Sequence, residues 1–439
     1  PHVYRVTVLA DVPLQLDGAG SGADAPTACP AEGSDADQGF NNTSGLTGPE
    51  GETEEDQACA PIPSIDIAKT VSAGPTPNGD GTWTVTYDVV ATNEGAADGT
   101  YEVTDRMTAD GDLEVRSGAV VTAPDGVTPN AAWTGLGAEG APENVIASGV
   151  VLPAGGTHTY QVEVVLGIAE GVEGVPVITP CSAEPGASPG GLSNAATVEH
   201  NDLTDDATAC VAIAYIVVDK SISAGPTPNG DGTWTIVYDV VAENVGGESG
   251  EYDVFDRLHY GDGIEILDAA VTTAPDGVET NAGWTGRGAE TSDPENLVAS
   301  GVELAAGATH TYQVEVTVQM DEATIDPADL QCPPPGSGAN GGLANSASLD
   351  HNGIVAEDGV CASLPLIGIE KSISAGPTGN GDGTWTITYD LVATNTGQAA
   401  GDYDLVDQLL YGEGIVVESA SVATAPEGVE TNAGWTGQG

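Results

Sequence analysis

Basic side chains are scarce in this chain. It has eight lysine and arginine residues against 67 aspartate and glutamate residues, which gives a formal net charge of −59. A surface this negative repels nucleic acid phosphates and anionic lipid headgroups. No segment reads as a signal peptide, a membrane span or a lipid anchor. We therefore expect no nucleic acid partner and no direct insertion into a membrane.

Signatures of catalysis on an external substrate are also missing. The sequence has no nucleophile with an adjacent base, no glycine-rich phosphate loop and no carboxylate pair in a plausible cleft. Hydrophobic residues nevertheless make up 40% of the chain. Because they alternate as in β-strands, we expect folded domains with acidic surfaces. Such surfaces suit a secreted protein or a site for divalent cations, although solubility alone explains them too.

Lysine occurs only three times, always at the same point of a repeated sequence with a period of 151 residues. The copies read IAKTVSAGPTPNGDGTWTVTYDVVATN, VDKSISAGPTPNGDGTWTIVYDVVAEN and IEKSISAGPTGNGDGTWTITYDLVATN. A period of this length predicts tandem globular domains rather than a solenoid. We predict complete repeat domains at 62–212 and 213–363. Residues 1–61 match the C-terminal part of a repeat, and residues 364–439 match the N-terminal part.

Short runs of alternating residues predict that each repeat is almost purely β. Trp83, Val85 and Tyr87 alternate with threonines, and turns rich in Gly, Pro, Asn and Asp separate such runs. This pattern predicts tandem immunoglobulin-like antiparallel β-sandwiches, an all-β fold. Only a few residues join one copy to the next, so we expect a fairly stiff rod.

The six cysteines lie in pairs near the end of each copy, without histidine at metal-ligand spacing. We therefore predict one disulfide per repeat and an oxidising compartment. The predicted pairs are Cys29 with Cys59, Cys181 with Cys210, and Cys332 with Cys361.

Three polar residues of each repeat fall in phase with core-facing apolar residues. Lys69 shares its face with Ile65, Ile67 and Val71. An aspartate follows each lysine by 36 residues, and an asparagine follows Lys69 and Lys220 by 125, each in phase with apolar neighbours. The equivalent residues are the lysines Lys69, Lys220 and Lys371, the aspartates Asp105, Asp256 and Asp407, and the asparagines Asn194, Asn345 and Asn42.

A lysine, an acid and an asparagine that meet in a core can form an intramolecular amide. Burial lowers the pKa of the lysine and raises the pKa of the aspartate. The neutral amine can then attack the asparagine carbonyl while the acid moves protons, and ammonia leaves. The plainer alternative is an unreacted buried Lys–Asp pair with the asparagine satisfying spare hydrogen bonds. The scarcity of lysine elsewhere favours the crosslink.

The same segments carry a resemblance to known repeat domains. The AKTVS opening, the NGDGTWTVTYDVVATNEG hairpin, the YEVTDRM strand and the closing SNAATV resemble repeats of bacterial and archaeal surface proteins. Those in turn are similar to collagen-adhesin and Gram-positive pilin domains that contain Lys–Asn isopeptides with an acidic catalyst. The resemblance implies bonds from Lys69 to Asn194 and from Lys220 to Asn345. Asp105 and Asp256 would assist them.

The two partial repeats depart from this pattern. Lys371 and Asp407 have no downstream asparagine, and Asn42 has no upstream lysine. Two explanations remain open. The chain is a segment of a longer array, or residues 1–61 of one copy complete the sandwich begun by residues 364–439 of another, by strand addition.

The loops offer weaker candidates. Each NGDG segment contains an aspartate, Asp80, Asp231 or Asp382, that calcium could use, but two candidate side chains fall short of a six-oxygen site and a hairpin turn explains these residues better. Trp133 and Trp284 could stack on sugars or pack at the edge of the core.

These observations lead to one functional expectation and one alternative. We expect a stalk or fibre segment at the cell surface that requires no cofactor and has neighbouring copies or further repeats as partners. The only catalysis that we expect is autocatalytic formation of the isopeptide bonds, with a single turnover at each site. The alternative is a calcium-dependent or carbohydrate-binding adhesin module that recognises a host or matrix glycan or protein.

Overall fold

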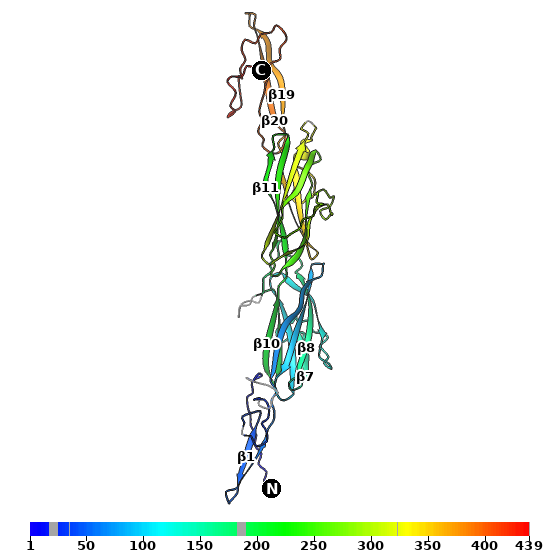
Figure 1. The fold of residues 1–439 in the computed structure, drawn as a ribbon, viewed down its shortest axis with the longest axis vertical. Coiled ribbons are helices and arrows are strands. Elements are labelled where there is room, and N and C mark those ends of the chain that lie inside the picture. The colour runs from blue at the N-terminus through cyan, green and yellow to red at the C-terminus, as the bar shows by residue number, and fades with distance from the viewer. Residues whose placement is uncertain (17–24, 35, 182–189, 323, 439) are drawn as a thin grey trace.

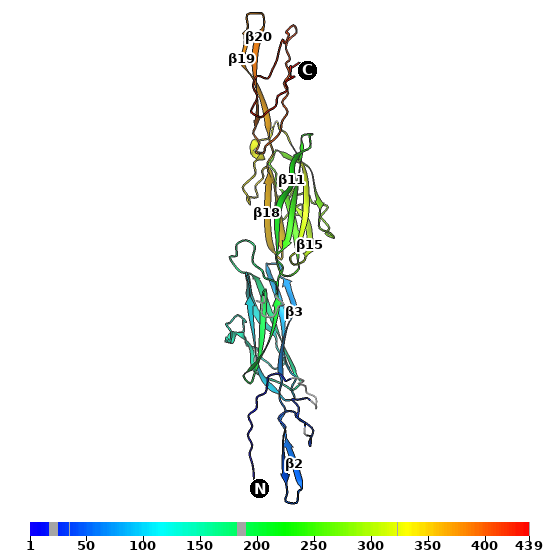
Figure 2. The same cartoon turned by 90° about the vertical axis from the view of Figure 1, so that its left-hand side faces the viewer.

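The computed structural model describes residues 1–16, 25–34, 36–181, 190–322 and 324–438. These residues form an elongated rod in which β-sheets follow one another along the long axis (Figures 1 and 2). The amino terminus lies at one end of the rod and the carboxy terminus near the other (Figure 1). Tension between the termini therefore runs along the rod.

Two four-stranded antiparallel sheets form the first sandwich, between residues 65 and 211. A 3₁₀ turn, η1 (Pro142–Asn144), precedes its strand β7. The first sheet has the order β3 (Ile65–Pro77), β4 (Thr82–Asn93), β8 (Thr157–Ile168), β6 (Leu113–Thr122). The second sheet has the order β10 (Leu203–Val211), β9 (Leu192–His200), β5 (Gly99–Ala109), β7 (Val145–Leu152).

The second sandwich repeats this arrangement between residues 216 and 362. A 3₁₀ turn, η2 (Pro327–Leu330), precedes its strand β17. One sheet has the order β11 (Ile216–Pro228), β12 (Thr233–Asn244), β16 (Thr309–Met320), β14 (Ile264–Thr273). The other has the order β15 (Leu297–Leu304), β13 (Gly250–Leu258), β17 (Leu343–His351), β18 (Ile354–Ala362).

A two-stranded hairpin lies beyond each end of the two sandwiches. The N-terminal hairpin pairs β1 (Asn42–Thr47) with β2 (Thr53–Ala58), and the C-terminal hairpin pairs β19 (Ile367–Gly379) with β20 (Trp385–Asn395). Residues 1–8 and 402–409 match β8 and β5 in sequence but form no strand in the described structure. Val3 and Tyr4 are consequently 89% and 87% exposed.

Alternating side chains build the cores, as strand geometry requires. In β4, Val85, Tyr87 and Val89 are fully buried, and the residues between them are partly exposed. Each sandwich has its own core cluster, to which both of its sheets contribute. The predicted fold class, tandem immunoglobulin-like antiparallel β-sandwiches, is confirmed. The predicted domain boundaries stay predictions.

The three predicted disulfides are present. Each disulfide joins a cysteine that precedes the last hairpin of a repeat to a cysteine in, or just after, the second strand of that hairpin. The two cysteines are 29 or 30 residues apart. A loop of this length predicts a contribution of about 3 to 4 kcal/mol through the unfolded state. The bonds are Cys29–Cys59, Cys181–Cys210 and Cys332–Cys361.

Three disulfides are typical of proteins that fold in an oxidising environment. In the described ranges, no helix has both the length and the apolar character needed to cross a membrane.

Candidate functional site

The first strand of each sandwich turns one lysine into the core. Lys69 in β3 follows the buried residues Ile65 and Ile67 at the strand period of two, and its side chain is wholly buried. Lys220 in β11 occupies the equivalent position and is equally buried. The prediction that these two lysines face the core is confirmed.

An aspartate from the opposite sheet meets each buried lysine. Lys69 Nζ forms an ion pair with the Asp105 carboxylate of β5, and Lys220 Nζ forms one with Asp256 of β13. Both aspartates are 0% exposed. Each ion pair therefore connects the two sheets of a sandwich through its interior.

The third predicted residue, an asparagine, lies beside the aspartate on the neighbouring strand. In β9 the partner of Asp105 is Ala196, and Asn194 is two residues along on the same face. Asn345 has the same place in β17 relative to Asp256. Asn194 and Asn345 are 0% and 1% exposed. Lysine, aspartate and asparagine thus meet in both sandwiches, as their phase predicts.

The asparagine side chains are unusual among buried asparagines of this chain. Neither Nδ2 nor Oδ1 of Asn194 or Asn345 has a hydrogen-bond partner among the described residues. Asn93, also 0% exposed, accepts from the Ser64 and Gly95 amides and donates to the Leu152 carbonyl. An unsatisfied buried polar group costs about 1 to 3 kcal/mol. The unsatisfied side-chain amides of Asn194 and Asn345 therefore require an explanation that packing alone does not give.

Burial sets the protonation of the first site. It lowers the pKa of Lys69, and the Asp105 charge opposes this only in part. Burial raises the pKa of Asp105 against the effects of Lys69 and of the nearby Asn194 amide, which lies close enough to favour the carboxylate without forming a full hydrogen bond. Both shifts favour transfer of the proton from the ammonium to the carboxylate. In the second sandwich, burial likewise lowers the pKa of Lys220.

Two aromatic residues support the site, and sequence reasoning did not assign them to it. The Tyr87 ring of β4 lies 5.0 Å from Lys69 Nζ, within cation–π range. The Trp133 indole Nε1–H donates to the Asp105 backbone carbonyl at 3.2 Å. Trp284 does the same for Asp256 at 3.0 Å. The sequence feature that could have predicted this contact is the constant spacing of 28 residues between the aspartate and the tryptophan.

Trp133 and Trp284 are therefore core residues. They are only 5% and 7% exposed, so neither presents a ring face for stacking on a sugar. The alternative prediction for the WTG segments, that their tryptophans pack at the edge of the core, is confirmed.

The two sites differ at the tyrosine hydroxyl. The Tyr238 hydroxyl donates to the Leu343 carbonyl at 2.8 Å and contacts the Tyr260 hydroxyl at 3.0 Å. The equivalent Tyr87 hydroxyl has no partner within the described part of the chain. Ala109 stands where the second sandwich has Tyr260. The second site is consequently closed by one more hydrogen-bonded side chain than the first.

The C-terminal hairpin carries an incomplete site. Lys371 pairs with Asp407, and Trp435 Nε1–H donates to the Asp407 carbonyl at 2.9 Å. The Lys371 side chain is 36% exposed, so the prediction that it is buried is wrong. Strands β19 and β20 form a two-stranded sheet, and no opposite sheet covers the pair in the described structure.

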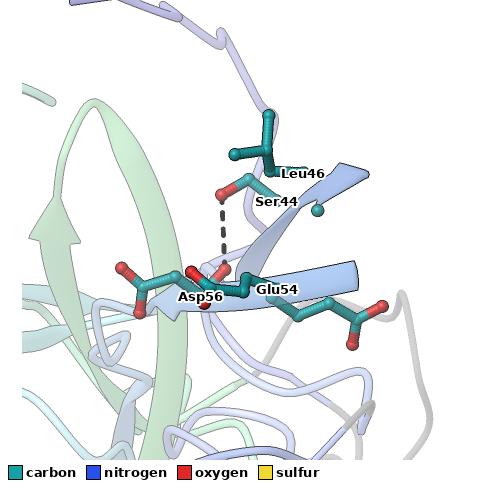
Figure 3. Close-up of a pocket in the computed structure, with 6 residues that line it drawn as sticks. Ser44, Leu46, Glu54 and Asp56 are labelled. Carbon is teal, nitrogen blue, oxygen red and sulfur yellow. Dashed lines mark hydrogen bonds between the residues drawn. The ribbon is translucent and has the colours of Figure 1, made fainter. Parts of the chain in front are cut away.

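Asn42 does not meet Lys371 within this chain. It lies in the exposed strand β1, at the opposite end of the rod from β19 (Figure 1). Its predicted core-facing position is also wrong, because β1 pairs only with β2. A hollow on this hairpin, between Ser44, Leu46, Glu54 and Asp56, is open to solvent (Figure 3).

The calcium candidates lie in hairpin turns. The Asp80 carboxylate accepts hydrogen bonds from the amide and the hydroxyl of Thr82, at 3.1 and 2.6 Å. The same hydrogen bonds, from Thr233 and Thr384, lower the pKa of Asp231 and of Asp382. Across the described ranges, no three His, Cys, Asp or Glu side chains converge as metal ligands would.

Comparison with known proteins gives distant structural likenesses. No known protein family matches the chain, and no curated protein matches it. Escherichia coli alpha-2-macroglobulin activated by porcine elastase aligns with 76% of this chain at 12% identity and a TM-score of 0.19, and the aligned part is 26% of that chain. A tetra-tandem repeat from the extending region of a large adhesion protein aligns with 80% of this chain and 69% of its own, at 11% identity and a TM-score of 0.21. TM-scores this low do not establish a shared fold, so the fold rests on the sheets described above.

Removing one member of a buried ion pair should cost far more than removing the exposed equivalent. Asp256→Ala leaves the Lys220 ammonium buried and unpaired, so we expect a loss of about 3 to 5 kcal/mol in the second sandwich. Asp407→Ala is the matched control at the partly exposed pair, with an expected loss of at most about 1 kcal/mol. Hydrogen exchange of β12 and β20 amides measures both. Equal effects would contradict the burial of the Lys220 site.

Proposed function

We propose that this chain is a load-bearing segment of an extracellular stalk or fibre, and that a Lys–Asn isopeptide locks each sandwich. The observation that carries the proposal is the pair of buried, unsatisfied asparagine amides, each beside a buried Lys–Asp pair. One orphaned amide would be an isolated cost in stability. Its recurrence with the same neighbours in both sandwiches favours a reaction site.

The reaction needs only groups that the site contains. A proton passes from the Lys69 ammonium to the Asp105 carboxylate, and the neutral amine attacks Cγ of Asn194. A bond forms between Lys69 Nζ and Asn194 Cγ, and the bond from Cγ to Nδ2 breaks. The Asp105 carboxyl gives its proton to the leaving Nδ2 and takes one from Nζ, so that ammonia leaves and the carboxyl ends protonated. The fixed geometry and low dielectric of the core favour each step. This would be a single turnover of the protein on itself.

The position of the crosslink suits a mechanical role. Tension along the chain would enter the first sandwich at β3 and leave it at β10, the first and last strands of that sandwich. A bond from Lys69 to Asn194 would bypass the 125-residue interval between them. The Cys181–Cys210 disulfide overlaps this loop, because Asn194 lies between the two cysteines. The two bonds together leave only short segments able to extend.

The partial sites at the chain ends suggest how such segments join. Lys371 and Asp407 at one end lack the asparagine that Asn42 supplies at the other. We propose that a complementary half from another copy, or from another repeat of the same protein, completes this sandwich. Apolar residues that alternate on residues 1–8 and 402–409 would enter its core.

Mass spectrometry tests the intramolecular bonds. After reduction and denaturation, we expect the chain to weigh less than its sequence by two molecules of ammonia, one for each complete site. The Asn194→Ala and Asp105→Ala variants should each weigh less than their own sequence by only one molecule of ammonia. The Lys220–Asn345 site, which is unchanged in both, serves as the internal control. A branched peptide containing Lys69 and Asn194 would locate the bond. A wild-type mass equal to the sequence mass would exclude the crosslinks.

Force spectroscopy tests the mechanical role separately. We expect Asn194→Ala to release roughly 350 Å of extra chain when the first sandwich unfolds, since residues 69–181 become extensible while the disulfide still bypasses residues 182–209. The wild type should lack this step under the same load. A step of equal length in the wild type would mean that no bond bypasses the sandwich.

Denaturing electrophoresis tests the joining of ends. If Asn42 of one copy bonds Lys371 of another, concentrated protein should give a ladder of multimers that resists boiling in SDS. Lys371→Arg should abolish the ladder, and Lys69→Arg should leave it intact. A single band at the mass of one chain, at every protein concentration, would show that copies of this chain do not join covalently.

A further inference from the structure

The hairpin between β3 and β4 touches the second sandwich. Its tip, residues 78–82, lies against the turn between β17 and β18, residues 351–354, although the two segments are about 270 residues apart in sequence. Asn352 makes all three hydrogen bonds between them. Its Oδ1 accepts from the Gly79 amide (2.6 Å), its backbone carbonyl accepts from Gly81 (2.7 Å), and its Nδ2 donates to the Thr82 carbonyl (2.8 Å).

The turn has a backbone suited to this contact. Asn352 and Gly353 both have positive φ, 53° and 76°. A Cβ atom on Gly353 would overlap the carbonyl of Gly79. In the equivalent turn between β9 and β10, Asn201 and Asp202 have φ of 51° and 59°, so that turn accepts a side chain at the second position. The approach of the hairpin tip, not the turn itself, therefore requires glycine at 353.

Apolar contacts surround these hydrogen bonds. Ile354 packs against the core cluster of the first sandwich, and the His351 ring lies 6.0 Å from the Trp83 ring. Trp83 is 2% exposed, whereas the equivalent Trp234 of the second sandwich, whose hairpin tip makes no such contact in the described structure, is partly exposed. The same tryptophan is thus buried where a following turn covers its hairpin.

His351 connects the turn to the linker between the sandwiches. Its ring nitrogens lie 2.7 Å from the Glu251 carbonyl in β13 and 3.3 Å from the Ala214 carbonyl in the linker. The turn is therefore held at three points: the hairpin tip, its own sheet and the linker.

We propose that the hairpin tip and the turn form a docking site between successive sandwiches that fixes their relative orientation. The partner that the tip fits is a His-Asn-Gly β-turn of the following repeat. This role does not depend on the isopeptide bonds. It assigns a function to the NGDG segment, because the Gly79 and Gly81 amides of that segment bind the turn.

The tip at residues 229–232 has the same NGDG sequence and provides an internal comparison. No hydrogen bond involves the Gly230 or Gly232 amide in the part of the chain that the structure describes. The two tips therefore differ in docking but not in sequence.

Hydrogen exchange of the full chain tests the proposal. We expect the amides of Gly79 and Gly81 to exchange more slowly than those of Gly230 and Gly232 by about two- to tenfold, the effect of one hydrogen bond per amide. Equal exchange at the two tips of the wild type would overturn the docking site.

Two variants and one control assign the difference to the turn. Asn352→Gly keeps the positive φ and removes only the side chain, while Gly353→Asp copies the residue of the undocked turn. Gly353→Asp should bring exchange at residues 79–82 to that of 230–233, and Asn352→Gly should do so at Gly79, whose amide bonds the Asn352 side chain. Strands β12 and β16 should stay protected in both variants as evidence that the second sandwich is folded. The matched control, Asn201→Gly, should leave the tip protected. Persistent protection in both turn variants would contradict the proposal.

Discussion

The buried ion pair between the first strand and the opposite sheet is the constraint on which each sandwich depends. An ammonium and a carboxylate removed from water are costly unless their geometry is fixed and their remaining contacts are satisfied. Here the strand period places Lys69 inside, a tryptophan holds the backbone of Asp105, and a tyrosine ring covers the lysine. Core packing in this region thus serves to position one polar contact. The unsatisfied Asn194 amide beside it is the observation on which the proposed crosslink rests.

Strength along the rod has two independent sources in this arrangement. Covalent bonds within a sandwich limit how far it can extend, because the disulfide and the proposed isopeptide enclose overlapping loops. Docking between sandwiches limits how far the rod can bend, and it uses three hydrogen bonds and a buried tryptophan. Loss of the docking site would leave each sandwich closed but free to swing on its linker. A rod without the proposed crosslink would stay straight but would be extensible under load.

Much of this organisation could be predicted from the sequence, because repeats and strand period are local signals. The 151-residue period located the equivalent lysines, and alternation assigned Lys69, Asp105 and Asn194 to the interior. The same reasoning failed for Lys371 and Asn42, since burial requires an opposite sheet that a single strand pattern does not guarantee. The Trp133 contact and the Asn352 docking site were not predicted either. Both join residues that are distant in sequence, and their motifs fit an ordinary turn or core equally well.

The negative charge of the chain explains why the docking site uses uncharged groups. With a formal net charge of −59, neighbouring sandwiches repel each other, and there are only eight basic residues to form ion pairs between them. The contact instead uses backbone amides, one uncharged asparagine and apolar side chains. Such groups lose little attraction when salt screens charge, whereas the repulsion that they oppose becomes weaker. A rod built in this way should therefore become stiffer, not looser, as ionic strength rises.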